Sequence, residues 1–226
     1  MRIRLEHCLF KMGKMNSNIL EEYNKKLSLY QEFCSTMQNL LSNVLVNNGY
    51  KCQVTSRIKS FESVKEKISR KVEKGIACKK LSDITDIAGI RIIFYLESDK
   101  KKFISDLYKE LTPQNLKLFE RHKEMGYLST HVIAMFGSKR LMLGEYKKYK
   151  GLQCEIQLTS ALYHAWAEIE HDIFYKPDES MTKRQQQAVR NLKKDLKEAM
   201  VDHIQKASDL LESVVEKVRN IKINKT

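Results

Sequence analysis

The sequence predicts an α/β (α+β) domain in which a mixed five-stranded sheet is flanked by helices. Five short runs have the composition and the bounds of β-strands, and helical segments alternate with the first of them along the chain. Two long helical patterns stand at the ends, outside this alternation. At 226 residues the chain has the length of one domain that buries a substantial core.

The first element is a long amphipathic helix, predicted from about residue 17 to residue 47 because apolar residues recur there every three or four positions. The sequence Asn-Asn-Gly-Tyr at 47–50 ends it, since Asn and Gly readily take the left-handed conformation that closes a helix. Met15 is an alternative start of the protein, and residues 1–14 are then an extension of unknown use.

The strand runs follow in the middle of the chain. They lie at 51–59, in the apolar part of 78–96, and at 115–122, 127–136 and 152–158. Helices are expected between the early strands, at 60–73 and 100–111, and after the last strand, at 160–175 and from about 182 to the C-terminus. Pro113 and Pro177 both fall where elements should break.

The charge balance favours an anionic partner. Lys and Arg number 41 against 28 Asp and Glu, a formal net charge of +13, and the usual anionic partners are nucleic acid, a nucleotide or a membrane surface. The codon usage of an AT-rich genome also enriches lysine, so the surplus has an alternative explanation.

Cysteine usage and apolar runs indicate a cytoplasmic protein without a membrane partner. The five cysteines are odd in number and widely spaced, with no C-x-x-C pair, which predicts reduced thiols and neither a disulfide framework nor a zinc site. No apolar run reaches the roughly 18 residues of a membrane span, and the N-terminus lacks a signal-like apolar block.

A basic motif precedes and enters the second helix. Arg57 and Lys59 share one side of a strand end, and Lys67 lies roughly two turns into the helix that follows. Cations that converge on a helix N-terminus bind phosphate, because the unpaired N–H groups and the positive charge act together. A solvated lysine-rich helix face explains the same spacing.

Acidic residues flank two of the strands. Asp86 stands just before a buried strand that contains Gly89 and Arg91, which is a common place for a magnesium ligand, although Asp86 can instead cap a turn and pair with Arg91. Glu155 and Gln157 project on one face of the last strand. A carboxylate held there beside Asp86 can share the metal or take a proton from a hydroxyl.

Two further groups have both a functional and a structural interpretation. Tyr127 follows Gly126, so its ring can stack on a nucleobase or fill the core after a turn. His164, Glu168 and His171 share one face of the next helix. Because no H-E-x-x-H pattern accompanies these three, we expect a satisfied buried polar network rather than a metal site.

In this order, the motifs resemble the synthetase domain of the RelA/SpoT family over about residues 50–177. The family's landmarks are R-x-K with a lysine on the next helix, D-x-x-G-x-R, a Gly-Tyr loop followed by S-x-H, and E-x-Q followed by W-x-x-x-E-H and Y-K. Here they are Arg57, Lys59, Lys67, Asp86, Gly89, Arg91, Gly126, Tyr127, Ser129, His131, Glu155, Gln157, Trp166, Glu170, His171, Tyr175 and Lys176.

The resemblance implies a single nucleotidyltransferase-like domain over 1–226, with an N-terminal helix at 17–47, a core at 50–177 and basic C-terminal helices at 182–226. It implies a pyrophosphokinase that transfers the β,γ-pyrophosphate of ATP to a ribose 3′-hydroxyl. The implied catalytic residues are Asp86, Glu155, Tyr127 and Gln157, of which Asp86 and Glu155 would bind Mg²⁺. ATP would be bound by Arg57, Lys59, Ser63, Lys67 and Arg91, with Arg57 and Arg91 sandwiching the adenine, and the acceptor by Tyr127, His131, Lys123 and Arg121.

Two departures from the family bear on the acceptor. Met125 stands where enzymes that make (p)ppGpp commonly have Asn before Gly-Tyr, and Thr159 stands where their E-x-Q-x-R-T motif has Arg. Both weaken the case for GTP or GDP as the acceptor. The chain looks most like the toxic small alarmone synthetases, some of which pyrophosphorylate the 3′-CCA end of tRNA and so block translation.

A tRNA acceptor also accounts for the charge, because neutralising several phosphates adds affinity. The candidate tRNA contacts are Lys25, Lys26, Lys147, Lys148, Lys150, Lys183, Arg184 and Arg190. A toxin of this type implies an antitoxin partner, whereas the oligomeric state is left open. The alternatives are a (p)ppGpp or (pp)pApp synthetase and, in another class, an inactive nucleic-acid-binding module.

Overall fold

A computed structural model describes residues 2–122, 128–174 and 181–223 of the chain. The strands are β1 (Cys52–Ile58), β2 (Ala88–Phe94), β3 (Leu116–His122), β4 (Leu128–Ala134) and β5 (Cys154–Ser160). The helices are α1 (Arg2–Asn47), α2 (Phe61–Glu73), α3 (Glu97–Leu111), α4 (Ser138–Leu141), α5 (Ala161–Phe174), α6 (Lys183–Glu198) and α7 (Gln205–Ile223). A 3₁₀ turn, Lys147–Tyr149, precedes β5, and a π-helical segment, Ala199–Ile204, joins α6 to α7.

The five strands form one mixed sheet in the order β1-β2-β5-β4-β3. β2 and β5 run parallel, and the other neighbouring pairs are antiparallel. Parallel strands need a long crossover connection, which here includes α3, β3 and β4. The predicted fold class, a mixed five-stranded sheet flanked by helices, is confirmed.

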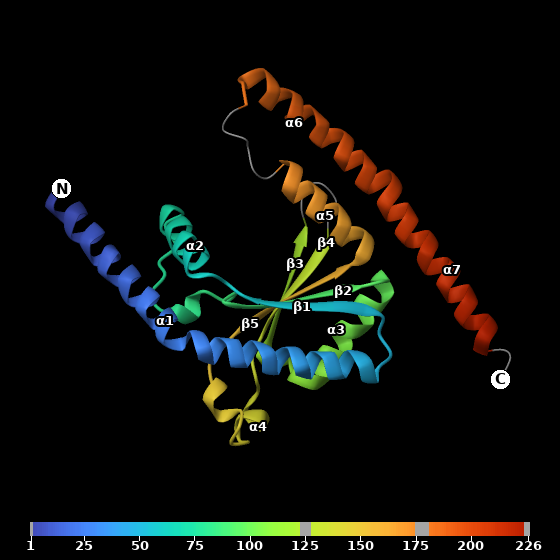
Figure 1. The fold of residues 1–226 in the computed structure, drawn as a ribbon, viewed down its shortest axis with the longest axis horizontal. Coiled ribbons are helices and arrows are strands. Elements are labelled where there is room, and N and C mark those ends of the chain that lie inside the picture. Colours follow the sequence, from blue (N-terminus) through green and yellow to red (C-terminus); the bar gives the residue numbers. More distant parts are fainter. Residues whose placement is uncertain (1, 123–127, 175–180, 224–226) are drawn as a thin grey trace.

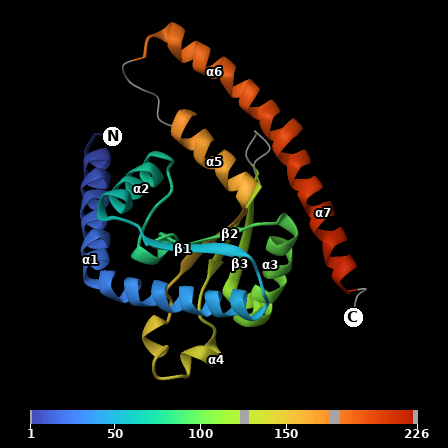
Figure 2. The ribbon, with the colours of Figure 1, turned by 45° about the vertical axis from the view of Figure 1, so that its right-hand side comes forward.

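The sheet has one apolar and one polar face, because side chains alternate along each strand. On the apolar face Ile90, Ile92 and Ile156 are buried against α1 and α3. Figures 1 and 2 show α1 and α3 on this side of the sheet and α2 and α5 on the other. The core therefore lies between the sheet and α1, which leaves the polar face to α2, α5 and solvent.

Helix α1 begins at Arg2, whereas the periodic pattern predicted a start near residue 17. The periodic apolar positions on which the predicted start was based begin at Ile19, so they did not indicate the earlier turns. Once a helix is nucleated, each further residue adds one hydrogen bond, and residues 2–16 contain no proline that would stop it. The predicted end is confirmed: α1 ends at Asn47, and Gly49 has a φ of 69°.

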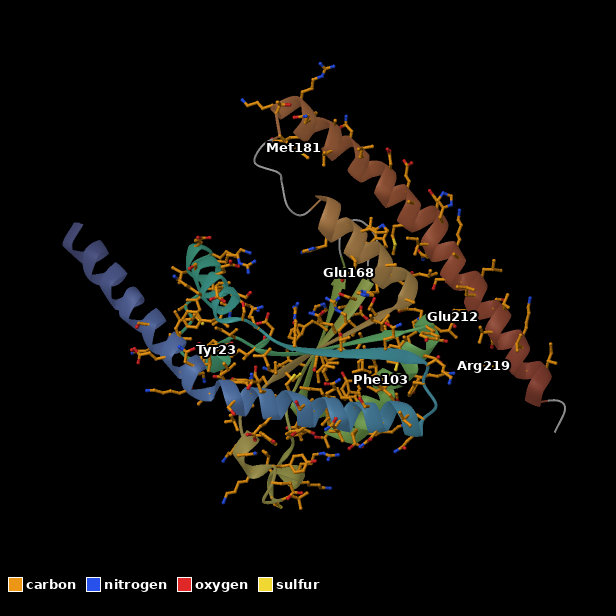
Figure 3. All side chains as sticks on the ribbon, in the orientation of Figure 1. Tyr23, Phe103, Glu168, Met181, Glu212 and Arg219 are labelled. Carbon is orange, nitrogen blue, oxygen red and sulfur yellow. The ribbon has the colours of Figure 1, made fainter. Side chains whose placement is uncertain are left out.

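Helix α7 contacts α3 through polar groups. The Ser98 amide donates to Glu212 Oε1 at 2.8 Å, and Arg219 NH2 lies 3.5 Å from Asp99 Oδ2. Figure 3 shows Glu212 and Arg219 along α7. The Ser98 contact explains why α3 begins at Glu97 and not at the predicted Lys100, since the capping carboxylate comes from a distant helix.

Two other predictions concern cysteines and membranes. Within the described ranges Cys34, Cys52, Cys78 and Cys154 are free thiols, and Cys154 is fully buried in β5, as its alternation with Ile156 along the strand predicts. None of the helices within those ranges is long and apolar enough to cross a membrane.

Replacing Phe33 by alanine should lower the free energy of unfolding by about 3–5 kcal/mol, because large-to-small changes in the core lose transfer energy and leave a cavity. Phe33 is fully buried in α1, and its ring packs edge-on against Phe136 at 5.4 Å between centroids. Denaturant unfolding measures the change. Val46→Ala is the control on the same helix: Val46 is 76% exposed, so a shift of at most about 0.5 kcal/mol is expected. Equal losses in the two variants would contradict this assignment of the core.

Candidate active site

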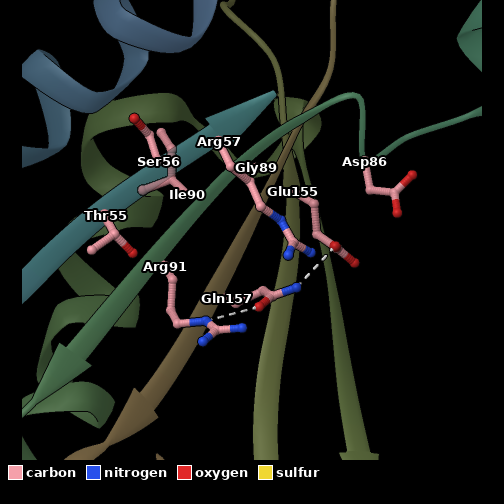
Figure 4. Close-up of a pocket in the computed structure, with 9 residues that line it drawn as sticks. All are labelled: Thr55, Ser56, Arg57, Asp86, Gly89, Ile90, Arg91, Glu155 and Gln157. Carbon is pink, nitrogen blue, oxygen red and sulfur yellow. Dashed lines mark hydrogen bonds between the residues drawn. The ribbon is translucent and has the colours of Figure 1, made fainter. Parts of the chain in front are cut away.

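The polar face of the sheet holds a cleft between α2 and α5. Its narrow part, of about 150 Å³, is lined by Thr55, Ser56, Arg57, Asp86, Gly89, Ile90, Arg91, Glu155 and Gln157. Figure 4 shows these side chains, with Asp86 on the loop that precedes β2. The cleft opens into a groove of about 820 Å³ along α2, which shares Arg57, Asp86, Glu155 and Gln157 with it and adds Lys59, Ser63, Glu66, Lys67, Arg70, Lys71, Lys74, Ile76, His131 and His171.

Strand register brings the predicted residues together. Gly89 lies opposite Arg57 on β1 and beside Glu155 on β5, and the next row on the same face pairs Arg91 with Gln157. Gly89 has no side chain, so the Arg57 side chain lies over it: a Cβ at this position would be 3.6 Å from Arg57 Cγ. Strands β1, β2 and β5 therefore place two arginines, a carboxylate and an amide together on the floor of the cleft.

Asp86 is held by the two lysines that the sequence predicts to bind phosphate. Lys59 Nζ lies 3.0 Å from Oδ2, and Lys67 Nζ lies 2.7 Å from Oδ1. Burial raises the pKa of this carboxyl, but the hydrogen bonds and charges of Lys67 and Lys59 outweigh burial and lower the pKa below its usual value. Asp86 is therefore ionised at neutral pH. Its alternative role, pairing with Arg91, is wrong because Arg91 pairs with an acid on α5.

The helix N-terminus that was predicted to meet these cations is formed by α2. Ser60 caps it, accepting a hydrogen bond from the Ser63 amide at 3.2 Å, and the two serine hydroxyls are 3.0 Å apart. The buried Tyr23 of α1 donates to the Lys59 carbonyl at 2.7 Å, so α1 holds the end of β1 in place. The predicted convergence of Arg57, Lys59 and Lys67 is observed, since all three line one groove together with Ser63. The binding of ATP by these residues stays a prediction.

Glu155 is buried in the floor of the cleft and is 8% exposed. Its Oε1 lies 2.9 Å from His131 Nδ1, its Oε2 accepts from Gln157 Nε2 at 3.2 Å, and His131 Nε2 lies 3.0 Å from Ser129 Oγ. Burial raises the pKa of Glu155, but the hydrogen bond and charge of His131 and the hydrogen bond of Gln157 lower it further than burial and Asp86 raise it. The carboxylate is therefore charged and oriented at neutral pH.

Arg91 links the floor to α5. Its Nε donates to Gln157 Oε1 at 3.4 Å, and its NH1 donates to Glu168 Oε1 at 2.8 Å. His164 Nδ1 lies 3.5 Å from the same Glu168 oxygen. The sequence predicted that His164, Glu168 and His171 form a buried polar network, and the burial is wrong. The Glu168 side chain is 52% exposed, and His171 is exposed at the wall of the groove. The face of α5 that carries them borders the open cleft and not the core.

The carboxylates of the cleft suit magnesium that arrives with a nucleotide. Within the described part of the chain, no three His, Cys, Asp or Glu side chains are grouped to hold a metal ion. Asp86 and Glu155, however, line the same cleft. Mg²⁺ typically takes one or two carboxylates together with phosphate oxygens and water, so this donor set fits the ion in the presence of a phosphate ligand.

The candidate tRNA contacts lie on different sides of the molecule. Lys147, Lys148 and Lys150 lie near α1 on the side of the sheet opposite the cleft: Lys148 pairs with Glu32, and Tyr149 packs on Phe33. By contrast, Lys25 and Lys26 are within one turn of Tyr23, which contacts the strand end at the groove.

The remaining candidates are only partly described. Lys183 and Arg184 are exposed at the start of α6. Tyr127 and Lys123 lie outside the described residues, as do the side chains of Arg121 and Arg190.

Three charged residues at or beside the cleft and groove have positions there that the sequence analysis did not predict. Arg70 and Lys74 line the groove beyond Lys67, and their spacing of three and four residues places them on one helix face, which was the available signal. The third is Glu168, whose contact with Arg91 joins residues 77 positions apart and left no local pattern.

Comparisons with known proteins agree with this geometry. The model of the region found in RelA/SpoT proteins matches residues 56–180. The GTP pyrophosphokinase YwaC of Bacillus subtilis is 27% identical over 214 residues, covering 90% of this chain and 92% of that protein. The GTP pyrophosphokinase YjbM of the same organism is 32% identical over 126 residues, which is 54% of this chain and 56% of that protein.

Solved structures share the fold. Small alarmone synthetase 1 of Bacillus subtilis bound to its product pppGpp superposes with a TM-score of 0.66 at 21% identity, over 88% of this chain and 99% of that chain. Small alarmone synthetase 2 of the same organism gives 0.60 at 25% identity, over 90% and 99% of the two chains. These matches confirm the predicted enzyme class, a pyrophosphokinase of the RelA/SpoT type. Since the family region covers more than half of its length, the chain belongs to the RelA/SpoT family.

Proposed function

We propose that the protein transfers the β,γ-pyrophosphate of ATP to the ribose 3′-hydroxyl at the 3′-CCA end of tRNA. The observation that supports the transfer is the convergence of two lysines, two arginines and two carboxylates in one cleft. Phosphoryl chemistry of this kind needs positioning and charge neutralisation more than covalent help from the protein, and these residues supply both.

On the donor side, the Lys59 and Lys67 ammonium groups and the Ser63 hydroxyl bind the triphosphate at the N-terminus of α2. The Arg57 and Arg91 guanidinium groups lie on the cleft floor, where planar groups of this type stack on an adenine ring. The triphosphate and the adenine of ATP thus have separate sites, the first at α2 and the second on the sheet.

The lysines of the donor site also control access to Asp86. In the nucleotide-free chain each carboxylate oxygen of Asp86 faces one ammonium. The phosphates of ATP compete for those ammonium groups and leave Asp86 free to act as a metal ligand with Glu155. Mg²⁺, when bound, neutralises phosphate charge and fixes the geometry of the triphosphate.

On the acceptor side, Glu155 accepts the proton of the attacking hydroxyl. A general base must be unprotonated and held in place, and the lowered pKa and the two hydrogen bonds of Glu155 meet both needs. His131 Nδ1 donates to Glu155, and its Nε2 forms a hydrogen bond with the Ser129 hydroxyl, so both ring nitrogens help to orient the base.

Two residues and the charge favour tRNA as the acceptor. Met125 and Thr159 replace the Asn and Arg that enzymes making (p)ppGpp commonly carry, and Thr159 is 3% exposed. The net charge of +13 exceeds what a mononucleotide requires. Exposed Arg70 and Lys74 extend the basic wall of the groove, and Lys25 and Lys26 lie near its end.

The second candidate acceptor is GTP or GDP, with adenosine nucleotides as a further form of the alarmone reaction. The names of the Bacillus relatives favour it, since both are GTP pyrophosphokinases.

The tRNA reaction would make the protein a growth-arresting toxin that needs an antitoxin. An antitoxin that blocks ATP would cover Arg57 and Arg91, and nucleotide competition for the complex tests that placement.

Incubation with γ-labelled ATP should transfer label to the 3′ end of deacylated tRNA. Parallel reactions contain GTP, GDP or an adenosine nucleotide, and gel electrophoresis with thin-layer chromatography separates the products. Periodate-oxidised tRNA, which lacks the 3′-hydroxyl, is the matched control and should take up no label. Label found only in guanosine tetra- or pentaphosphate would contradict the tRNA acceptor and establish the second candidate.

Glu155→Gln should lower the transfer rate by about 10²–10⁴, because it removes the general base and keeps the volume of the side chain. Single-turnover rates measure the change, with Glu73→Gln as the control: Glu73 is an exposed acid of α2 that does not line the groove. Growth arrest by expressed Glu155→Ala or Tyr127→Ala protein would instead favour the inactive nucleic-acid-binding module.

Lys67→Met should raise the affinity of the nucleotide-free protein for Mn²⁺ by about tenfold, since it removes one charge-assisted contact from Asp86. The free Mn²⁺ signal in electron paramagnetic resonance measures binding without turnover. Lys65→Met is the control, because Lys65 is an exposed cation of α2 outside the groove. An affinity unchanged in Lys67→Met, or raised equally in both variants, would contradict lysine control of Asp86.

A further inference from the structure

Helix α5 places a half-exposed carboxylate against an arginine of the cleft. Glu168 Oε1 accepts from Arg91 NH1 at 2.8 Å, although the two residues are 77 positions apart in the chain. Figure 3 labels Glu168 on α5, and Figure 4 shows the Arg91 side chain among the residues that line the cleft. The contact therefore joins α5 to the floor of the candidate active site.

We propose that Glu168 is a positioning residue that sets the plane of the Arg91 guanidinium for the purine ring of the donor nucleotide. The inference rests on the proposed function, because it assumes that a purine nucleotide stacks on Arg91. It goes beyond that function in assigning a role to Glu168, which would act through Arg91 and not by contact with the nucleotide.

Arg91 needs such a partner because its side chain is 33% exposed and has several rotatable bonds. An arginine loses roughly 2 kcal/mol of rotamer entropy when it is fixed, and stacking on a flat ring requires one orientation of the guanidinium plane. Gln157 holds only the Nε end of the group, at 3.4 Å, whereas Glu168 holds NH1. Two acceptors at two ends of a planar group define that plane before the nucleotide arrives.

The contact has little to contribute to folding. With its side chain 52% exposed, Glu168 forms the kind of ion pair that typically adds less than about 1 kcal/mol to stability. Helix α5 is anchored instead by Trp166, which is 1% exposed. A change at Glu168 should therefore alter the orientation of Arg91 in the nucleotide-free protein and leave the fold intact.

The positioning extends toward the acceptor side through a series of hydrogen bonds. Gln157 accepts from Arg91 through Oε1 and donates to Glu155 through Nε2, so the orientation of Arg91 also determines which end of the amide faces the carboxylate. Because the first link is the donor-binding arginine, loss of Glu168 should act mainly on nucleotide affinity and only weakly on the rate of transfer.

Calorimetry with the non-hydrolysable analogue AMPCPP tests the proposal on the full chain. Glu168→Ala should raise the Kd for AMPCPP and the KM for ATP about tenfold, with kcat changed less than about threefold and an unchanged Tm. Glu168→Asp should recover part of the affinity, because it restores a carboxylate. Glu73→Ala, which removes an exposed acid outside the groove, should bind as the wild type does.

A double-mutant cycle with Arg91→Met separates positioning from a general charge effect. Glu168→Ala should weaken binding no further once Arg91 is replaced. Equal weakening in both backgrounds, or an unchanged Kd in Glu168→Ala, would overturn the inference while leaving the proposed function standing. A wild-type protein that fails to bind AMPCPP would instead overturn the proposed function, so the two failures are distinguishable.

Discussion

The parallel pairing of β2 with β5 is the constraint on which the site depends. In its register Gly89 lies beside Glu155 and Arg91 beside Gln157, and the antiparallel pairing of β1 adds Arg57 to the same rows. Side chains alternate with a period of two, so a slip of one residue would turn this polar set toward α1 and expose Ile90 and Ile156. Burial of the isoleucines against α1 therefore also holds the polar residues in the cleft.

Ion pairs and hydrogen bonds offset the cost of placing ionised side chains in the cleft. Burying ionised groups is costly unless each has partners, and the cleft gives both carboxylates partners: two lysines for Asp86, and a histidine and an amide for Glu155. The same contacts lower the pKa of both carboxyl groups. Their stabilising contribution is present above the ordinary carboxyl pKa and is lost as the pH falls through the lowered values. The ion pairs of Asp86 with Lys59 and Lys67 thus also connect the end of β1 and the loop before β2 to α2.

Local patterns predicted the elements well where burial is periodic. The end of α1 at Asn47 follows from turn chemistry, the buried Cys154 of β5 follows from alternation, and α2 (Phe61–Glu73) lies within the predicted helix at 60–73. The start of α1 and the start of α3 at Glu97 were not predicted, since the periodic apolar pattern of α1 begins only at Ile19 and the first turn of α3 is capped by Glu212 from α7. Boundaries that depend on a distant partner have no local signal.

The sequence by itself determined the residue types of the proposed site: the basic motif of Arg57, the acid before β2 and the strand of Glu155 are each visible as local patterns, and their order resembles the RelA/SpoT family. The tertiary structure decided what those residues contact. It placed both lysines on Asp86, turned the acid of α5 outward onto Arg91, and put the Lys148 region on the opposite side from the cleft. Such pairings join segments far apart in the chain, and their geometry is set by sheet register and helix docking, which no local pattern encodes.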